Sequence, residues 1–441
     1  MKPFLFLLCI PVLYFYPVLY PSFACFTSIF FAKDKQFGSV SLYLIFSSCV
    51  IGSLICATIT PQSDTEVYIV SFKTALDTIN SYRISLNSGH EPLYQVYEYF
   101  LRFIIGDHEK IFLLITALLF NIFSTLGLLN IFSRIKKFKL GCIAISIYNS
   151  LVAPYLGVPL FLLASSLSLS IMILAISFYK RRRIIYHILS LISIFIHYGS
   201  ISIWILFTFR DFFRKMMNKI TYNNIFIKQK LLNKLYLLIL LLLLLVATII
   251  PQAMVLFIYQ LANTFYTSGL FASGKLLVFI NKDSDSIENF ISFSSPVFLT
   301  QIALSCLCFW QIKKDTIIND SNDDTKLHEF LEILRLLGKL QITLIIMTLP
   351  FSFLPYRLAL FNFLYFPLWL INIPFISISN SKEIKNYSKY MILLALISLL
   401  AFSFYRIPKI QNSDINDTRG LVVLDKRPLD YNLVKLIEYF Y

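Results

Sequence analysis

The chain has 441 residues, of which 57% are hydrophobic and only 14% are charged. Soluble domains carry roughly a quarter charged residues, so this composition argues against a water-soluble protein. A net charge of +15 would suggest nucleic acid as the partner of a soluble protein. In a membrane protein, this charge must first be divided between the two faces of the bilayer.

Long apolar segments follow one another from the first residues onward. About 20 apolar residues span a bilayer as a helix, which satisfies its own backbone hydrogen bonds. The N-terminal segment MKPFLFLLCIPVLYFYP lacks a small-residue cleavage site, so we expect a retained first span and not a cleaved signal peptide. Candidate spans lie at about 4–32, 38–59, 111–132, 140–158, 160–179, 184–208, 235–258, 292–311, 340–355, 357–377 and 390–405.

These segments predict an all-α, polytopic integral membrane protein with about 10–12 transmembrane helices, some of them short or broken. We expect a single transmembrane domain over residues 1–441. The seven cysteines lie mostly in apolar stretches, where they serve as small packing residues. Cys306 and Cys308 have no histidine nearby, so we expect no metal site. No P-loop and no GxGxxG motif is present, and we expect no nucleotide cofactor.

Basic clusters set the orientation in the membrane, because cytoplasmic loops carry an excess of Lys and Arg. The clusters lie at 134–139, 180–183, 210–234, 313–314 and 382–389. If the loops that contain them and residues 33–37 are cytoplasmic, that side holds 25 of the 39 basic residues but only 9 of the 24 acidic residues. The loops 60–110 and 259–291 and the tail 406–441 are then periplasmic. The basic side would contact anionic membrane lipid.

Residues 184–208 contain no Asp, Glu, Lys or Arg, yet basic clusters flank them on both sides. Two half-helices broken near residues 197–200 would enter and leave on the same side. Such breaks are tolerated where they line protein or a wet cavity. A single span that violates the charge rule is the alternative, and the sequence leaves both open.

Two ionisable residues stand out as candidates for acid–base chemistry. Glu91 precedes Pro92 at the predicted start of a helix, where it either stabilises the helix end or takes part in a site. His197 lies within a long apolar run, which makes it a functional candidate by default. An imidazole can act as general base or acid near neutral pH. A structural histidine bonded to a carbonyl is the alternative.

Arginines on the outer face are candidates for binding an anion. Arg83 and His90 lie in the loop before Glu91, and Arg357 opens a late span after a minimal loop. Arginine binds phosphate through two oxygens at once, although Arg357 could also simply anchor its helix at the headgroups. Asp64 and Glu66 are either catalytic carboxylates or solvated loop charges.

The order of these motifs resembles the EpsG/Wzy-like family of bacterial polysaccharide polymerases over roughly residues 60–380. The shared features are an outer loop with Asp and Tyr, EPLY at a helix start, a basic turn followed by a span with FIHYGS, and a late span opened by YR. The matching residues are Asp77, Tyr82, Glu91, Pro92, Tyr94, His197, Arg357, Tyr365 and Phe366. The segment ASSLSLSI at 164–171 departs from the family, whose members often carry an arginine there.

The resemblance implies an O-antigen or capsule polymerase of the bacterial inner membrane, with its active site facing the periplasm. It would transfer a growing glycan from undecaprenyl pyrophosphate to the terminal sugar of a new lipid-linked repeat unit. A chain-length regulator protein could be a partner, and nucleic acid is not. His197 or Glu91 would take the acceptor proton. The residues expected to hold pyrophosphate or glycan are Arg357, Arg83, Tyr82, Tyr94, His90 and Asp77.

Two other functions fit the same composition. An O-antigen ligase would use similar lipid-linked donors, and a flippase would move a lipid-linked oligosaccharide without chemistry. Whichever holds, the topology predicts that Arg83, Glu91, Arg357 and the break at 197–200 lie on one face and line one cavity.

Overall fold

The computed structural model describes residues 2–17, 19–32, 36–60, 64–80, 91–134, 163–179 and 181–201, together with short stretches elsewhere up to residue 440. The chain divides into two units, and the first comprises Met1–Ser200, Leu364–Pro374 and Leu399–Tyr441. All elements discussed below belong to this first unit. They are helical apart from one pair of two-residue strands, in line with the predicted helical class.

The N-terminal segment forms a helical hairpin. Helix α1 (Lys2–Phe15) ends before Pro17, and α2 (Tyr20–Phe31) begins after it. The rings of Phe6 and Phe31, at opposite ends of the segment, lie 6.2 Å apart, so the two helices run antiparallel. The single span expected over 4–32 is therefore wrong, because Pro17 lacks the N–H that would continue the first helix.

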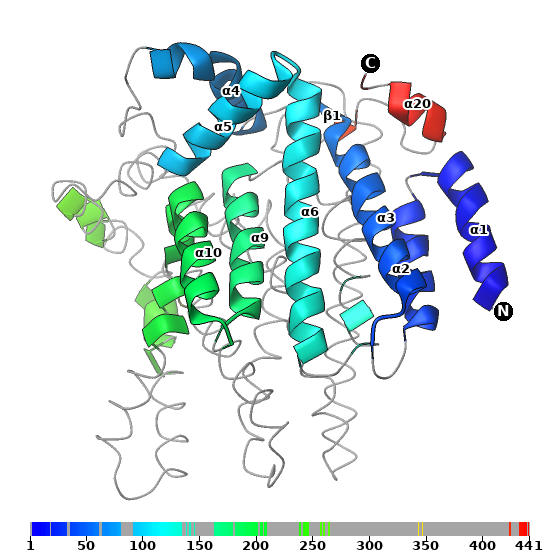
Figure 1. Cartoon of the computed structure of the whole chain (residues 1–441). Helices are drawn as coiled ribbons and strands as arrows, with labels where there is room; N and C mark the ends of the chain where they lie inside the picture. Colours follow the sequence, from blue (N-terminus) through cyan, green and yellow to red (C-terminus); the bar gives the residue numbers. More distant parts are fainter. Residues whose placement is uncertain are drawn as a thin grey trace, which may run out of the picture. The chain divides into compact units, whose positions relative to one another are not determined.

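Four helices stand side by side and form the body of this unit (Figure 1). They are α3 (Ser39–Ala57), α6 (Glu109–Arg134), α9 (Leu163–Ser177) and α10 (Arg183–Ile196). Their bounds agree with the spans predicted near 38–59, 111–132, 160–179 and the first half of 184–208. The remaining predicted spans lie largely or wholly outside the described residues.

Small residues and polar pairs hold these helices together. Asn121 on α6 donates a hydrogen bond to Ser53 on α3, and Asn130 on α6 donates to Ser177 on α9, each at 2.8 Å. A Cβ at Gly127 would lie 2.9 Å from the backbone of Ile173, so α6 and α9 approach closely at this glycine. Small residues and interhelical hydrogen bonds of this kind are typical of helix packing in membranes.

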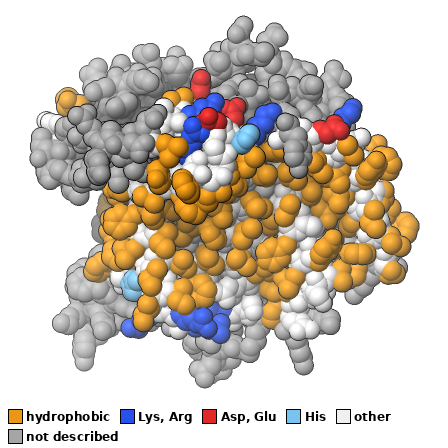
Figure 2. All heavy atoms as spheres, turned by 45° about the horizontal axis from the view of Figure 1, so that its top comes forward, with side chains coloured by type: hydrophobic (Ala, Val, Ile, Leu, Met, Phe, Trp, Pro, Cys, Tyr) orange, Lys and Arg blue, Asp and Glu red, His pale blue; other side chains and the backbone are white. Residues whose placement is uncertain are grey.

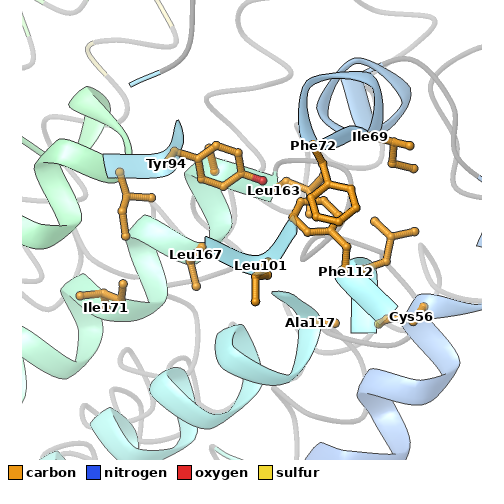
Figure 3. Close-up of a cluster of buried hydrophobic side chains, with 14 residues drawn as sticks. Cys56, Ile69, Phe72, Tyr94, Leu101, Phe112, Ala117, Leu163, Leu167 and Ile171 are labelled. Carbon is orange, nitrogen blue, oxygen red and sulfur yellow. The ribbon is translucent and has the colours of Figure 1, made fainter. Parts of the chain in front are cut away.

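Helices α4 (Asp64–Asn80) and α5 (Pro92–Ile105) lie across one end of this body (Figure 1). A cluster of buried hydrophobic side chains packs them against this end, with contributions from α3, α4, α5, α6 and α9 (Figure 3). The rings of Phe72 and Phe112 stack with centroids 4.3 Å apart, and the Tyr94 ring meets Tyr68 edge-on at 5.2 Å. We call this the α5 end of the unit.

The C-terminal segment returns to the α5 end. Strand β1 (Ile59–Thr60), which follows α3, pairs antiparallel with β2 (Val423–Leu424). The short helix α20 (Leu433–Glu438) follows and packs against α1. Residues near 60 and near 424 were both predicted to be periplasmic, and their pairing places them on the same side.

The surface of the helices is largely apolar, whereas many serines and threonines are buried (Figure 2). On α10, the exposed apolar side chains are Ile184, Ile188, Leu191 and Phe195, while Ser190 and Ser193 are fully buried. Among the described residues, α3 and α6 are long and apolar enough to cross a membrane. The other apolar helices, including α1, α2, α9 and α10, are shorter.

Candidate acid–base pair at a helix break

Glu91 caps α5 through its backbone and not through its side chain. Its carbonyl oxygen accepts hydrogen bonds from the N–H groups of Tyr94 and Gln95, at 3.1 and 3.2 Å. Pro92 occupies the first helical position, where a missing N–H has no consequence. The side chain makes no capping hydrogen bond, so any stabilisation of the helix end by the carboxylate would act through its charge.

His197 lies at a break in the helix that starts with α10. The helix ends at Ile196, His197 has an extended backbone with φ −156° and ψ 116°, and a 3-10 turn, η2, follows over Tyr198–Ser200. The helix is therefore broken at residues 197–200, as in one of the two alternatives that the sequence left open. The course of the chain beyond residue 201 is described only in part, so the choice between a span and a hairpin stays a prediction.

The two predicted acid–base residues meet. Nδ1 of His197 lies 2.7 Å from Oε1 of Glu91, and 22% of the His197 side chain is exposed against 6% for Glu91. When Glu91 is ionised, its carboxylate can only accept, and the contact then places the proton on Nδ1 of the imidazole. In neutral His197 the lone pair then resides on Nε2, which makes Nε2 the basic atom and Glu91 the residue that orients the ring.

Gly199 leaves room beside the basic nitrogen. A Cβ at position 199 would lie 3.1 Å from Nε2 and 3.2 Å from Cδ2 of His197. Gly199 itself is exposed. The edge of the imidazole that faces away from Glu91 is therefore bordered by a residue without a side chain.

The inward face of α5 carries Tyr94 and a second carboxylate. Ser71 on α4 donates a 2.8 Å hydrogen bond to Oε2 of Glu98, which is 1% exposed. Burial, reinforced by the nearby Glu98 carboxylate, raises the pKa of Tyr94 well above its ordinary value, so this phenol stays protonated. Tyr94 is fully buried. Its predicted role in holding a glycan stays a prediction.

The other predicted site residues are not placed at the pair. Asp77 belongs to the last turns of α4, and Glu66 in its first turn is exposed, as a solvated charge would be. Tyr82, Arg83, His90 and Arg357 lie outside the described residues. Sequence reasoning missed Glu98, Gly199 and a set of three serines described below. A carboxylate in the middle of an amphipathic helix was the available signal for Glu98.

Within the ranges that the structure describes, no group of three or more His, Cys, Asp or Glu side chains could hold a metal ion. Two ion pairs at the α5 end do not include Glu91 or His197: Lys73 pairs with Glu109 at 2.7 Å, and Arg102 pairs with Asp107.

No protein-family model, curated protein or solved structure matches this chain. The arrangement defines a histidine–carboxylate pair at a helix break.

Proposed function

We propose that the chain is a polytopic membrane protein that polymerises lipid-linked glycan repeat units at the periplasmic face of the bacterial inner membrane. The single observation that carries this proposal is the contact between Glu91 and His197. The resemblance to the polymerase family includes both residues, and 106 positions separate them in the chain.

The distribution of side chains supports a lipid environment. In water, a large exposed apolar surface is unfavourable and uncommon on a monomer. The exposed stripe on α10 repeats at Ile184, Ile188, Leu191 and Phe195, which is one face of a helix. Its opposite face buries serines. This pattern suits a helix whose outer face contacts lipid and whose inner face uses small polar residues for packing.

Two contacts support the proposed orientation. The guanidinium of Arg134, at the end of α6, donates a 2.7 Å hydrogen bond to the carbonyl of Tyr179, after α9. Both residues border basic clusters assigned to the cytoplasm. At the opposite end, β1 pairs with β2, and both strands belong to segments assigned to the periplasm. Each contact joins segments that the charge rule independently assigned to one side.

The length of α10 indicates the depth of the pair. Its 14 residues extend about 21 Å, less than the roughly 30 Å of the hydrocarbon core. With Arg183 at the cytoplasmic interface, His197 would lie in the periplasmic leaflet, about 9 Å inside the edge of the hydrocarbon core. The proposal therefore requires a polar opening from the periplasmic side that admits the acceptor sugar and the donor pyrophosphate to this depth.

The pair has the chemistry that glycan transfer requires. The acceptor hydroxyl oxygen forms a bond to the anomeric carbon of the donor sugar, and its proton passes to Nε2 of His197. The bond from that carbon to the pyrophosphate oxygen breaks, and undecaprenyl pyrophosphate leaves with the electron pair. Glu91 stabilises the imidazolium that forms. Arg357 and Arg83 are proposed to hold the leaving pyrophosphate.

The test is complementation of a gene knockout, read as the ladder of lipid-linked polymer. His197→Gln should abolish the ladder at normal membrane abundance, while a single repeat unit is still transferred to the acceptor. His187→Gln is the matched control, because His187 lies on the same helix away from Glu91. A normal ladder from His197→Gln would refute the proposed chemistry. Loss of the single repeat unit in the knockout would favour a ligase or a flippase.

A further inference from the structure

Three serines surround the break that presents His197, and all are fully buried: Ser168 on α9, Ser193 on α10 and Ser200 at the end of η2. Ser168 lies in ASSLSLSI, the segment that departs from the polymerase family. The family resemblance therefore gives this segment no role. The hydrogen bonds of the three serines indicate a role for this segment.

The three serines form one hydrogen-bonded group. Ser193 Oγ donates to the carbonyl of Ser168 at 2.7 Å, and Ser168 Oγ donates to the carbonyl of Ser193 at 2.8 Å. Ser168 Oγ also lies 3.0 Å from Ser193 Oγ and makes a short contact with Ser200 Oγ, and either hydroxyl can donate in each of these two contacts. Ser168 is the member that bonds to both others.

The same serines hold the backbone of His197 from both sides. The carbonyl of Ser193 that accepts from Ser168 also accepts the N–H of His197 at 3.0 Å. The N–H of Ser200 donates to the carbonyl of His197 at 3.1 Å. Ser168 therefore adds a bond from the neighbouring helix to the carbonyl that accepts the last helical hydrogen bond before the break.

We propose that Ser168 is a positioning residue for the Glu91–His197 pair, acting through Ser193 and Ser200 to fix the backbone of the break. The inference rests on the proposed function only for its activity readout, since the geometry of the pair can be measured directly. Removing the Ser168 hydroxyl takes one hydrogen bond from the Ser193 carbonyl and the hydroxyl partner from Ser200. The break loosens, and Nδ1 of His197 no longer stays on Glu91.

The matched control lies two residues away. Ser170 is also on α9 and fully buried, but its hydroxyl donates within its own helix to the carbonyl of Leu167 at 2.7 Å. Ser170→Ala therefore makes the same chemical change at the same burial without touching the break. Ser168→Ala should lower polymer formation by about tenfold or more, because small displacements of a catalytic group have large effects on rate. Ser170→Ala should stay within about twofold of the wild-type activity, since its hydrogen bond is local to the helix.

The direct test is nitrogen NMR of the purified full-length protein carrying ¹⁵N-labelled histidine, in lipid nanodiscs. The His197 signals are assigned by their loss in His197→Gln. The wild type should show one tautomer, with the proton on Nδ1. Ser168→Ala should broaden these signals or move them toward a mixture of tautomers, and Ser170→Ala should leave them unchanged. If Ser168→Ala does not accumulate, Ser200→Ala makes the same test with one bond removed.

The outcomes separate this proposal from the proposed function. Wild-type histidine signals in both Ser168→Ala and Ser200→Ala would overturn the positioning role, whatever the polymer ladder shows. Altered signals together with a normal ladder in His197→Gln would uphold the positioning role and refute the polymerase chemistry. A loss of activity in Ser170→Ala equal to that in Ser168→Ala would indicate a general packing effect and would also overturn the proposal.

Discussion

The carboxylate of Glu91, just before α5, meets the imidazole of His197, just after α10, with Oε1 and Nδ1 2.7 Å apart. Glu91 precedes Pro92, the first residue of α5, and His197 follows Ile196, the last residue of α10, with an extended backbone. The contact therefore joins the start of one helix to the end of another, and 22% of the His197 side chain is exposed.

The first prediction concerns the charge of Glu91. In Glu91→Gln the amide can still reach Nδ1, but it cannot stabilise an imidazolium, and it can also donate and so reverse the tautomer. We expect polymer formation to fall on the order of a hundredfold or more. The readout is the polymer ladder at matched membrane abundance. Glu109→Gln, which removes a carboxylate paired with Lys73 at the same end, is the control and should retain activity.

The sequence predicted the acid–base pair but not the serines that surround it. His197 stood out because ionisable groups are rare in apolar runs, and Glu91 because it precedes Pro92 at a predicted helix start. The break was one of two alternatives, suggested by the basic clusters that flank residues 184–208 on both sides. Ser168 gave no such signal, since serine is common in membrane helices and its role depends on which helix faces it. That arrangement depends on tertiary packing between α9 and α10, which a local pattern does not reveal.

The fold, too, could be predicted from the sequence only where local properties decide it. The long uncharged runs predicted α3 and α6 within two residues at each end, because length and apolarity are local properties. The α1–α2 hairpin was missed, because Pro17 permits either a kink or a reversal. Contacts such as Phe6 with Phe31 decide between them. The pairing of β1 with β2 joins segments too far apart in sequence for any local pattern to indicate.

The second prediction concerns the space beside Nε2. A methyl group in Gly199→Ala would lie 3.1 Å from that nitrogen, close enough to push the ring by a few tenths of an ångström. We expect activity to fall several-fold in Gly199→Ala and to be lost in Gly199→Val, at normal abundance. Equal activity of both variants and the wild type would mean that the substrate does not approach Nε2 along this edge.

The third prediction tests the orientation in the membrane. In a cysteine-free background, Val67→Cys should react with an impermeant thiol reagent added to whole cells with a permeable outer membrane. Val67 is 57% exposed on α4, at the α5 end. Arg182→Cys, exposed before α10, should react only after the inner membrane is opened. The opposite pattern would invert the topology, and labelling of both from outside would contradict a membrane between them.

The fourth prediction concerns the close approach of α6 and α9. In Gly127→Ala the added methyl would meet Ile173 Cγ2 at 2.8 Å and the Leu174 nitrogen at 2.9 Å. We expect overpacking to lower the free energy of unfolding by about 1–3 kcal/mol, measured by denaturant titration in mixed micelles. Gly52→Ala is the control. Its methyl would meet Pro21 at 3.9 Å, an ordinary contact, so the stability should not fall.

The last prediction concerns Arg357, which lies outside the described residues and remains a proposed ligand of the donor pyrophosphate. A lysine keeps the charge and could anchor a helix at the headgroups, but it cannot form the two parallel hydrogen bonds of a guanidinium. If Arg357 holds the pyrophosphate, Arg357→Lys should fail nearly as badly as Arg357→Ala. Losing bonds that strengthen as charge builds on the leaving group should cost about 3 kcal/mol, or about a hundredfold in rate.

The polymer ladder, at matched membrane abundance, again provides the measurement. Arg182→Lys changes an exposed arginine in the basic cluster before α10, and this control should give a normal ladder. A normal ladder from Arg357→Lys would identify Arg357 as a helix anchor and remove it from the donor site. If both Arg357 variants fail while His197 keeps its wild-type NMR signals, the defect lies in the proposed donor binding and not in the geometry of the acid–base pair.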